Sequence, residues 1–397
     1  MMKTLPLTAR AKTTALKQPR EIFVYARDID NEYIFDETKV KQEHIPYYYL
    51  ANADIDYKQA KLDLSAGYSH FKKIDPELNL ADFDKLLQGI QHHEQSTQKK
   101  LDGDIITFRG IMTKIISMPY FLTDPIDLNI VPFDGQLFIA QDKIIELNRM
   151  KRQEEELINN NPPDKVEHIK KCEFSGYKFE TLATIPHPWA QTPRPQIDNR
   201  NKKIVNNYEQ YLSVIKTGIG NVKLILAGEI DCVWDYIPEK TKTVLDHYVE
   251  LKTSRIIEHN GQVVNFEKKL FKTWCQSFLM GVRKVVYGFR DDNFILRSVE
   301  PYNTDEIPIM IKDNPITQNN KNKINCTNAL KWYGAVLDWI VENVDKKDES
   351  KSYRLSYDPG SRTFSLMELP GEDNKRLRNG EILTREFKEW RESLKKK

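Results

Sequence analysis

Apolar residues alternate with polar ones, or run without interruption, in several short segments, and this pattern predicts β-strands. The most apolar segment is 224–234, and 248–252 follows it; both are rich in Val, Ile, Leu and aromatic residues. The turn sequence Asp358-Pro359-Gly360 lies inside an alternating stretch and predicts a hairpin. The other segments expected to be strands, this hairpin included, are 104–116, 136–140, 174–180, 285–289, 294–299 and 353–366.

Apolar residues spaced three or four apart predict helices elsewhere in the chain. The clearest case is 82–95, where Phe83, Leu86, Leu87 and Ile90 recur at helical spacing. The segments 266–280 and 321–344 show similar patterns, and the charged segment 142–157 is also expected to be helical. Helical and strand segments follow one another in mixed order, without an internal repeat or a sharp change of composition. We therefore expect a single α+β domain with mixed β-sheets flanked by helices.

Both ends of the chain are basic, which predicts segments outside the folded domain. Residues 1–20 contain five basic residues and no acidic one, so they are expected to form a flexible basic arm. Residues 391–397 are expected to form a basic tail, which leaves 21–390 for the domain itself. The five basic residues of the arm are Lys3, Arg10, Lys12, Lys17 and Arg20.

Charged residues lie inside two of the expected strands. Residues i and i+2 of a strand point to the same face, so Glu229 shares a face with Asp231, and Glu250 with Lys252. Burying an ionised carboxylate costs several kcal/mol unless it is paired. A divalent cation such as magnesium, which prefers carboxylate and carbonyl oxygens, would offset this cost. The arrangement therefore suits a metal-dependent phosphodiester hydrolase, in which the ion activates water and a lysine steadies the phosphate.

Either pair alone could instead be an exposed strand face with alternating charges, because such tripeptides are common. Three further features favour a site. Both pairs lie in successive apolar strands, the downstream helix could carry Gln276 over them, and the upstream strand at 174–180 ends in Glu180. Arg109 lies inside the expected strand at 104–116, beside Gly110, where a phosphate could approach closely. Alternatively, Arg109 could be a structural arginine in an edge strand, where it would pair with a carboxylate.

Composition excludes few functions. The 397 residues are 40% hydrophobic, and 60 basic residues against 58 acidic ones give a net charge of +2. Nucleic-acid contact would therefore depend on local clusters of basic residues. Four cysteines without C-x-x-C spacing argue against structural zinc or a disulfide framework. No apolar run approaches the length of a membrane span, so we expect a soluble intracellular protein without membrane contact.

Four short motifs in order resemble those of the DXO family of RNA 5′-end decapping enzymes, distant relatives of the PD-(D/E)XK nucleases. They are a Gly-hydrophobic-x-hydrophobic-Glu motif at 176–180, Glu-hydrophobic-Asp at 229–231, Glu-hydrophobic-Lys at 250–252, and Phe108-Arg109-Gly110. Residues 209–220 resemble the fungal nuclear branch, whose members bind and stimulate a nuclear 5′-to-3′ exoribonuclease. The resemblance extends from about Gly67 to about Tyr302 and implies a PD-(D/E)XK-nuclease-like core.

The resemblance also implies a role for each matching residue. Magnesium or manganese would be held by Glu180, Asp231, Glu250 and the Leu251 carbonyl, with Glu229 reaching the ion through water and orienting the nucleophile. Lys252 and Gln276 would hold the phosphate under attack. Arg109, in the motif with Phe108 and Gly110, would hold the RNA backbone.

As the resemblance implies, the domain at 21–390 would be a catalytic decapping nuclease domain. Its substrates would be RNA 5′ ends that are incompletely capped, NAD-capped or triphosphorylated, and it would bind the nuclear exoribonuclease and lie in the nucleus. Two other functions stay open. A non-catalytic stabilising subunit of the exoribonuclease would not need the intact carboxylates and lysine. A generic PD-(D/E)XK DNA nuclease would not need the motifs at 108–110 and 176–180.

Overall fold

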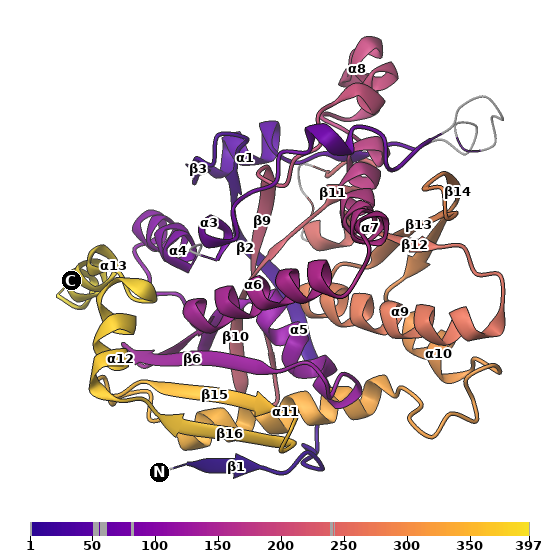
Figure 1. Cartoon of the computed structure of the whole chain (residues 1–397). Helices are drawn as coiled ribbons and strands as arrows, with labels where there is room; N and C mark the ends of the chain where they lie inside the picture. The colour runs from indigo at the N-terminus through magenta and orange to yellow at the C-terminus, as the bar shows by residue number, and fades with distance from the viewer. Residues whose placement is uncertain are drawn as a thin grey trace.

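The strands of this computed structural model form two mixed β-sheets (Figure 1). The structure describes residues 2–50, 55, 62–80, 83–238, 241 and 243–396. Within these residues one sheet has ten strands and the other has six. Helices pack on both sheets, so the expectation of a single α+β domain with mixed sheets is confirmed. No helix of the described part is long and apolar enough to span a membrane.

The ten-stranded sheet runs from the N-terminal strand, through the C-terminal hairpin, to β3 at its other edge. Its order is β1 (Lys3–Leu5), β16 (Thr363–Glu368), β15 (Tyr353–Asp358), β6 (Ile126–Phe133), β7 (Gln136–Gln141), β5 (Ile105–Phe108), β10 (Val222–Glu229), β9 (Gln210–Ile219), β2 (Leu16–Arg27) and β3 (Tyr33–Ile34). The six-stranded sheet has the order β14 (Leu296–Asn303), β13 (Lys284–Arg290), β12 (Tyr248–Arg255), β11 (Cys232–Val233), β4 (Tyr47–Tyr48) and β8 (Thr184–Ile185).

The helices vary from one turn to 21 residues. They are α1 (Glu37–Glu43), α3 (Pro76–Asn79), α4 (Phe83–Thr97), α5 (Arg109–Ser117), α6 (Lys143–Asn159), α7 (Pro163–Ala183), α8 (Arg194–Asp198), α9 (Asn260–Met280), α10 (Ile307–Lys312), α11 (Cys326–Asn343), α12 (Gly371–Arg376) and α13 (Arg385–Lys395). Single turns η1 to η6 lie at Tyr68–His70, Met118–Tyr120, Trp189–Gln191, Arg200–Lys202, Val244–His247 and Leu377–Glu381.

The largest apolar core is built from both sheets together with α5, α9 and α11. Ile115 of α5, Trp274 of α9 and Trp332 of α11 are buried there, against Leu226 of β10 and Val285 of β13. Trp332 Nε1 also donates a hydrogen bond of 2.9 Å to the Ile115 carbonyl. The expected strands at 136–140, 248–252 and 285–289, the hairpin and the helix at 266–280 are confirmed. The helix expected at 82–95 is α4, although Asp82 lies outside the described residues.

The expected basic arm is wrong, because its backbone pairs with the sheet. In β1, Lys3 pairs with Leu366 of β16 in antiparallel register, and β2 begins at Leu16, which pairs with Ile219 of β9. The exposed edge of β16 would otherwise leave backbone groups unpaired, and pairing does not depend on the charges of the side chains. The start of this segment, Met1, lies outside the described residues.

The expected basic tail is also wrong. Helix α13 continues to Lys395, and Arg391 in its last turns is fully buried against Glu94 of α4. Residues on both sides of the expected 21–390 boundaries therefore belong to the fold. Lys397 lies outside the described residues.

Two segments that were expected to be strands contain helices. Residues 104–116 form the short strand β5 and then α5, which begins at Arg109. Residues 174–180 lie inside α7. In both, buried residues recur four positions apart, as Ile111 and Ile115 do in α5 and Phe174 and Lys178 do in α7. The short Ile-rich run also fits strand alternation, and packing onto the sheets decides for the helix.

The expected strand at 224–234 is interrupted between its two acidic residues. β10, which belongs to the ten-stranded sheet, ends at Glu229, and β11, which belongs to the six-stranded sheet, begins at Cys232. The buried Ile230 makes the crossing and donates its amide to the Tyr211 carbonyl over 2.9 Å. Strand alternation therefore does not relate Glu229 to Asp231, and the crossing between the sheets sets their positions.

Helix α7 lies very close to β13 at Gly288. A Cβ atom at this position would lie 2.6 Å from the ring of Phe179, which is buried next to Glu180 in α7. We expect Gly288→Ala to lower the free energy of unfolding by ~1–3 kcal/mol, because the ring and its helix must move. Gly371→Ala is the matched control, since nothing lies within 4 Å of the added atom. Equal urea midpoints for the two variants would contradict this close packing.

Candidate active site

The acidic residues that the sequence singles out meet where the two sheets adjoin. Glu229 ends β10, and Asp231 lies in the crossing to β11. Glu250 and Lys252 lie on one face of β12, as strand alternation predicts. Glu180 comes from α7, in the turn that precedes the end of the helix. Two sheets, a crossing and a helix thus contribute to one cluster, which is called the carboxylate cluster below.

Two cations bond to Glu250. Arg109 Nη1 donates to its Oε2 over 2.8 Å, and Lys252 Nζ donates to its Oε1. The Glu250 side chain is 2% exposed, and burial alone would raise its pKa. The neighbouring charges of Arg109 and Lys252 outweigh burial and lower the pKa of Glu250 to about 2. Glu250 is therefore ionised at neutral pH, and Arg109 has the carboxylate partner that the alternative interpretation expected.

The other three carboxylates repel one another. Burial and the charge of Glu250 raise the pKa of Asp231 to about 7, although the Leu251 amide donates to Asp231 Oδ2 over 2.6 Å. Burial and the charges of Asp231 and Glu229 raise the pKa of Glu180 well above its usual value. Burial also raises the pKa of Glu229, against the opposing charge of Arg109. The cluster therefore favours the uptake of a proton or a cation.

Gln210 supports the cluster and was not expected from the sequence. It is the first residue of β9, and its Nε2 donates to Glu229 Oε2 over 3.0 Å. Antiparallel pairing of β9 with β10 places Glu229 opposite Leu212, within reach of this amide. A glutamine at the start of a strand gives no signal in the sequence, because the contact depends on the register of the two strands.

Helix α9 reaches the same region, as the sequence predicted. A Cβ atom at Gly228 would lie 3.0 Å from Met280 Sδ and 3.1 Å from Arg109 Cβ, so the end of α9 packs against the end of β10. Gln276 precedes Met280 by one turn and lies on the same side of the helix. It is half-buried and makes no hydrogen bond to the four carboxylates, all of which the structure describes. Its role on the phosphate stays a prediction.

Two cavities meet at Glu229. The larger has a volume of about 880 Å³, and its wall includes Phe108, Arg109 and Gly110. The smaller has a volume of about 170 Å³ and includes Glu180 and Asp231. Glu229 and Gln210 line both. The three residues of the Phe108-Arg109-Gly110 motif thus line the larger cavity, at its boundary with the carboxylate cluster.

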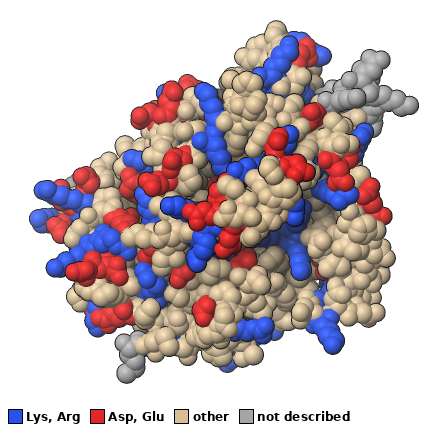
Figure 2. Space-filling view, viewed as in Figure 1, with Lys and Arg blue, Asp and Glu red and all other residues tan. Residues whose placement is uncertain are grey.

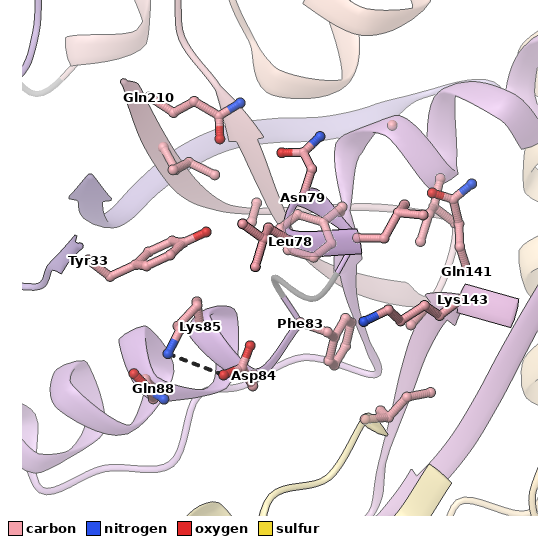
Figure 3. Close-up of a pocket in the computed structure, with 18 of the residues that line it drawn as sticks. Tyr33, Leu78, Asn79, Phe83, Asp84, Lys85, Gln88, Gln141, Lys143 and Gln210 are labelled. Carbon is pink, nitrogen blue, oxygen red and sulfur yellow. Dashed lines mark ion pairs between the residues drawn. The ribbon is translucent and has the colours of Figure 1, made fainter. Parts of the chain in front are cut away.

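The outer part of the larger cavity combines aromatic, amide and basic side chains (Figure 3). Tyr33 and Lys143 point into it from opposite sides, and Lys85 of α4 forms an ion pair of 3.3 Å with Asp84. Acidic and basic side chains are interspersed over the face shown in Figure 2, so positive charge is local, as the net charge predicted. The sequence did not identify this wall because its members come from distant segments: Tyr33, Leu78, Asn79, Phe83, Lys85, Gln88, Gln141 and Lys143.

The donors of the cluster fit a hard divalent cation. Carboxylate and carbonyl oxygens are the ligands that magnesium and manganese prefer. When all four carboxylates are ionised, they exceed the two bonded cations, Arg109 and Lys252, by the charge of one divalent ion. In the described part of the chain no three His, Cys, Asp or Glu side chains form a metal-holding group as they stand. Glu250 is bonded to Arg109 and Lys252 instead, and the assignment of individual ligands stays a prediction.

Known proteins match this chain over nearly its full length. A family model of RAI1-like PD-(D/E)XK nucleases matches residues 17–388. The decapping nuclease RAI1 of Candida albicans is 62% identical over 397 residues, which cover 100% of both chains.

Solved structures agree with this match. The crystal structure of Candida albicans Rai1 in complex with pU5-Mn²⁺ is similar with a TM-score of 0.96, over 99% of this chain and 100% of that one, at 62% identity. Scheffersomyces stipitis Rai1 in complex with (3′-NADP)⁺ and calcium ion is similar with a TM-score of 0.93, over 98% and 100%, at 59% identity.

These similarities confirm the PD-(D/E)XK-nuclease-like core, the hydrolase class and a divalent cation as cofactor. They also bear out the resemblance drawn from the four motifs. The chain belongs to the RAI1-like PD-(D/E)XK nuclease family.

Proposed function

We propose that this decapping nuclease acts on defective RNA 5′ ends, from which it removes incomplete caps, NAD-type caps or, from a 5′-triphosphate, pyrophosphate. The observation that carries the proposal is the position of the carboxylate cluster, which opens through Glu229 into a cavity of about 880 Å³. Such a volume suits a nucleotide rather than an isolated phosphate. Candida albicans Rai1 in complex with pU5-Mn²⁺ and Scheffersomyces stipitis Rai1 in complex with (3′-NADP)⁺ and calcium ion are similar structures, which supports the proposal.

Glu180, Asp231, Glu250 and the Leu251 carbonyl would hold the cation, which when bound polarises a phosphoryl oxygen and lowers the pKa of water. Glu229 accepts a hydrogen bond from Gln210, and its other oxygen can accept a proton from an attacking water. Its raised pKa suits a group that takes up a proton during the reaction. Glu229 would thus orient the nucleophile.

Arg109 and Lys252 would stabilise the charge that develops on the phosphate. Each uses only part of its donors on Glu250, since guanidinium carries five N–H groups and ammonium three. Burial strengthens such charge-assisted hydrogen bonds, and the Arg109 side chain is 11% exposed. Arg109 also lines the larger cavity, so its free donors can reach a ligand there.

The larger cavity would accept the nucleotides at the 5′ end. Phe83 and Phe108 lie edge to face with ring centroids 5.9 Å apart, and both line this cavity together with Tyr33. Aromatic rings of this kind stack on bases, and the amides of Gln141 and Gln210 can bond base edges or ribose. The stacking contacts need no particular base sequence.

A comparison of RNA 5′ ends tests the proposal. The purified protein would be incubated with Mn²⁺ or Mg²⁺ and otherwise identical RNAs that begin with a triphosphate, an unmethylated cap, an NAD cap or a monophosphate. We expect pyrophosphate from the first RNA and release of the intact cap structure from the next two. Hydrolysis of duplex DNA, together with no product from any modified 5′ end, would contradict the proposal and favour a generic nuclease.

Lys252→Gln separates a phosphate contact from a structural ion pair. The amide keeps much of the length of the side chain but removes the positive charge, so the rate should fall by about 100-fold, as loss of one transition-state donor does. Binding of Mn²⁺, measured by calorimetry, should be retained, because removal of a competing cation frees Glu250 for the metal. Lys223→Gln on β10, whose lysine pairs with Asp102 over 2.9 Å, is the matched control. Loss of Mn²⁺ binding in Lys252→Gln alone would show that the ion pair is structural.

We further propose that the protein binds and stimulates a nuclear 5′-to-3′ exoribonuclease and acts in the nucleus. The support is the likeness of residues 209–220 to the fungal nuclear branch; this segment contains the whole of β9. A partner surface needs about 800 Å² per side. A cleft that admits one RNA strand would not also provide this surface, so the two functions should be separable.

The double change Glu229→Ala, Asp231→Ala tests this separation. We expect it to abolish hydrolysis of every 5′ end, because two members of the carboxylate cluster are lost. Binding of the exoribonuclease in a pull-down, and its protection against thermal inactivation, should be unchanged. If the folded double variant no longer binds, the partner must dock on the catalytic face itself. If the unmodified protein neither hydrolyses any RNA 5′ end nor binds the exoribonuclease, both proposed activities are contradicted.

A further inference from the structure

A buried group of polar side chains, separate from the carboxylate cluster, connects the two sheets. Its members are Glu21 of β2, Tyr211 and Ser213 of β9, and Tyr248, the first residue of β12; together they are called the Glu21 cluster. Glu21 lies where the pairing of β2 with β9 shifts register, between Glu21 and Phe23. Such a bulge re-aims the side chains of the strand that contains it.

Every member of the Glu21 cluster takes part in a short hydrogen bond. The Tyr248 hydroxyl donates to Glu21 Oε2 over 2.8 Å, and Ser213 Oγ donates to the same oxygen over 2.8 Å. The hydroxyls of Tyr211 and Tyr248 lie 2.9 Å apart, and their rings meet edge to face. Tyr248 belongs to the six-stranded sheet and the other three residues to the ten-stranded sheet. The bonds therefore cross between the sheets.

The cluster places a carboxylate where a close-packed apolar group would be easier to bury. The Glu21 side chain is 7% exposed, and the nearest ion pair is with Lys41 Nζ at 3.8 Å, on a side chain that is 45% exposed. Burial raises the pKa of Glu21, while the hydrogen bonds from Ser213 and Tyr248 lower it. Burial and the charge of Glu21 raise the pKa of both tyrosines, so both stay protonated and can donate. The protein therefore keeps the directional hydrogen bonds to Glu21 even though burying this carboxylate costs free energy.

Tyr248 and Tyr211 each connect the Glu21 cluster to the carboxylate cluster. Tyr248 precedes Glu250 by two residues and lies on the same face of β12. The Tyr211 carbonyl accepts the amide of Ile230, which separates Glu229 from Asp231, over 2.9 Å. Tyr211 also lines the smaller cavity, together with Glu180 and Asp231. The hydrogen bonds of the Glu21 cluster thus join the crossing that carries Glu229 and Asp231 to the strand that carries Glu250.

We propose that Glu21, Tyr211 and Tyr248 are positioning residues for the hydrolysis, because their hydrogen bonds set the distance between the Glu229–Asp231 crossing and Glu250. The inference rests on the proposed function of the carboxylate cluster as the cation-binding site. Outer contacts that orient metal-binding carboxylates affect metal affinity and rate even though they touch neither metal nor substrate. Displacements near 1 Å change rates by roughly 100-fold.

Tyr248→Phe is the direct test, because it removes one hydroxyl and keeps the buried ring. We expect turnover to fall by about 10-fold and the Mn²⁺ dissociation constant, measured by calorimetry without RNA, to rise by about 10-fold, as for outer-shell partners of other metal sites. KM for RNA should stay within twofold, since the larger cavity is untouched. Glu21→Gln should keep part of the turnover and Mn²⁺ affinity that Glu21→Leu loses, because an amide oxygen still accepts a hydrogen bond from the Tyr248 hydroxyl.

Tyr357→Phe is the matched control, because it removes the hydroxyl of a buried tyrosine in β15, which donates to the Leu122 carbonyl over 3.1 Å. Four strands separate β15 from β9 in the ten-stranded sheet, and β12 belongs to the other sheet. The control should lose similar thermal stability and keep turnover and Mn²⁺ affinity. If Tyr248→Phe folds and matches Tyr357→Phe in both quantities, the inference is overturned. Should Tyr248→Phe not fold, Tyr211→Phe decides by the same two measurements.

The failure of the inference can be told apart from the failure of the proposed function. Unmodified protein that binds no Mn²⁺ would overturn the cation site and, with it, the inference. Unmodified protein that binds Mn²⁺, together with a folded Tyr248→Phe variant of unchanged affinity and turnover, would overturn the inference alone.

Discussion

Asp231→Asn is expected to lower turnover on every RNA 5′ end by about 100-fold or more, the loss that follows removal of a key electrostatic stabiliser. Asp231 lies in the crossing between the sheets, where the Leu251 amide holds its Oδ2 at 2.6 Å. An asparagine preserves the shape of the side chain and removes the charge, so the effect reports on charge. Glu180→Gln should act similarly, because its carboxylate approaches the same cluster from α7.

Folding should survive the loss of Asp231. Burial and the charge of Glu250 disfavour its ionised form, so removing this charge relieves repulsion when no cation is bound. We therefore expect the thermal midpoint in chelator to be unchanged or higher and the Mn²⁺-induced rise of the midpoint to be smaller. Asp102→Asn is the control, since this exposed carboxylate pairs with Lys216 and Lys223 away from the site. Near-normal turnover of Asp231→Asn at saturating Mn²⁺ would show that the site is wrongly assigned.

Arg391→Met is expected to lower the free energy of unfolding by ~3–5 kcal/mol, the usual cost of leaving a buried partner charge alone. Arg391 is fully buried in α13. Its Nε and Nη2 each donate to Glu94 over 2.7 Å, and Nη1 donates to Gln136 Oε1 over 2.9 Å. Glu94 is also fully buried and accepts the Leu101 amide over 2.8 Å. Methionine fills part of the space but leaves this carboxylate without its cation.

Urea unfolding followed by circular dichroism would measure this loss. Arg385→Met on the same helix is the control, since Arg385 is 83% exposed and its ion pair with Glu389 should contribute little. The double change Arg391→Met, Glu94→Leu should recover much of the loss, because no buried charge is then left unpaired. If Arg391→Met is as stable as Arg385→Met, the last turns of α13 behave as the solvated tail that the sequence suggested.

The residue types of the candidate site could be read from the sequence, whereas their supports could not. Acidic residues and a lysine inside apolar segments were recognisable because buried charge is unusual and needs a partner. The strand at β12 followed the expected alternation, so Glu250 and Lys252 share a face. Gln210 and the members of the Glu21 cluster gave no such signal, because their contacts depend on the pairing and packing of distant strands. Glu21 and Tyr248 are separated by 227 positions, and strand pairing brings them together.

The assignment of helix or strand failed where a short apolar run fitted both the helical and the strand periodicity. Residues 104–116 are rich in isoleucine, which favours strands locally, yet α5 begins at Arg109 and buries Ile111 and Ile115. The position of Arg109 depends on this boundary, because as the first residue of a helix it leaves the sheet and reaches Glu250. The sequence separation of 141 residues in this ion pair explains why local pattern could not predict it.

By itself, the sequence determined the chemistry that this protein can support: four carboxylates, a lysine and an arginine in apolar surroundings, and an α+β chain large enough to bury them. Side-chain identity and local periodicity suffice for this, since both are properties of short segments. Only the tertiary structure decided that the ten- and six-stranded sheets adjoin at Ile230, that Glu180 arrives on a helix, and that β1 and α13 belong to the fold. These features depend on pairing and packing between distant segments, whose free energy no local pattern records.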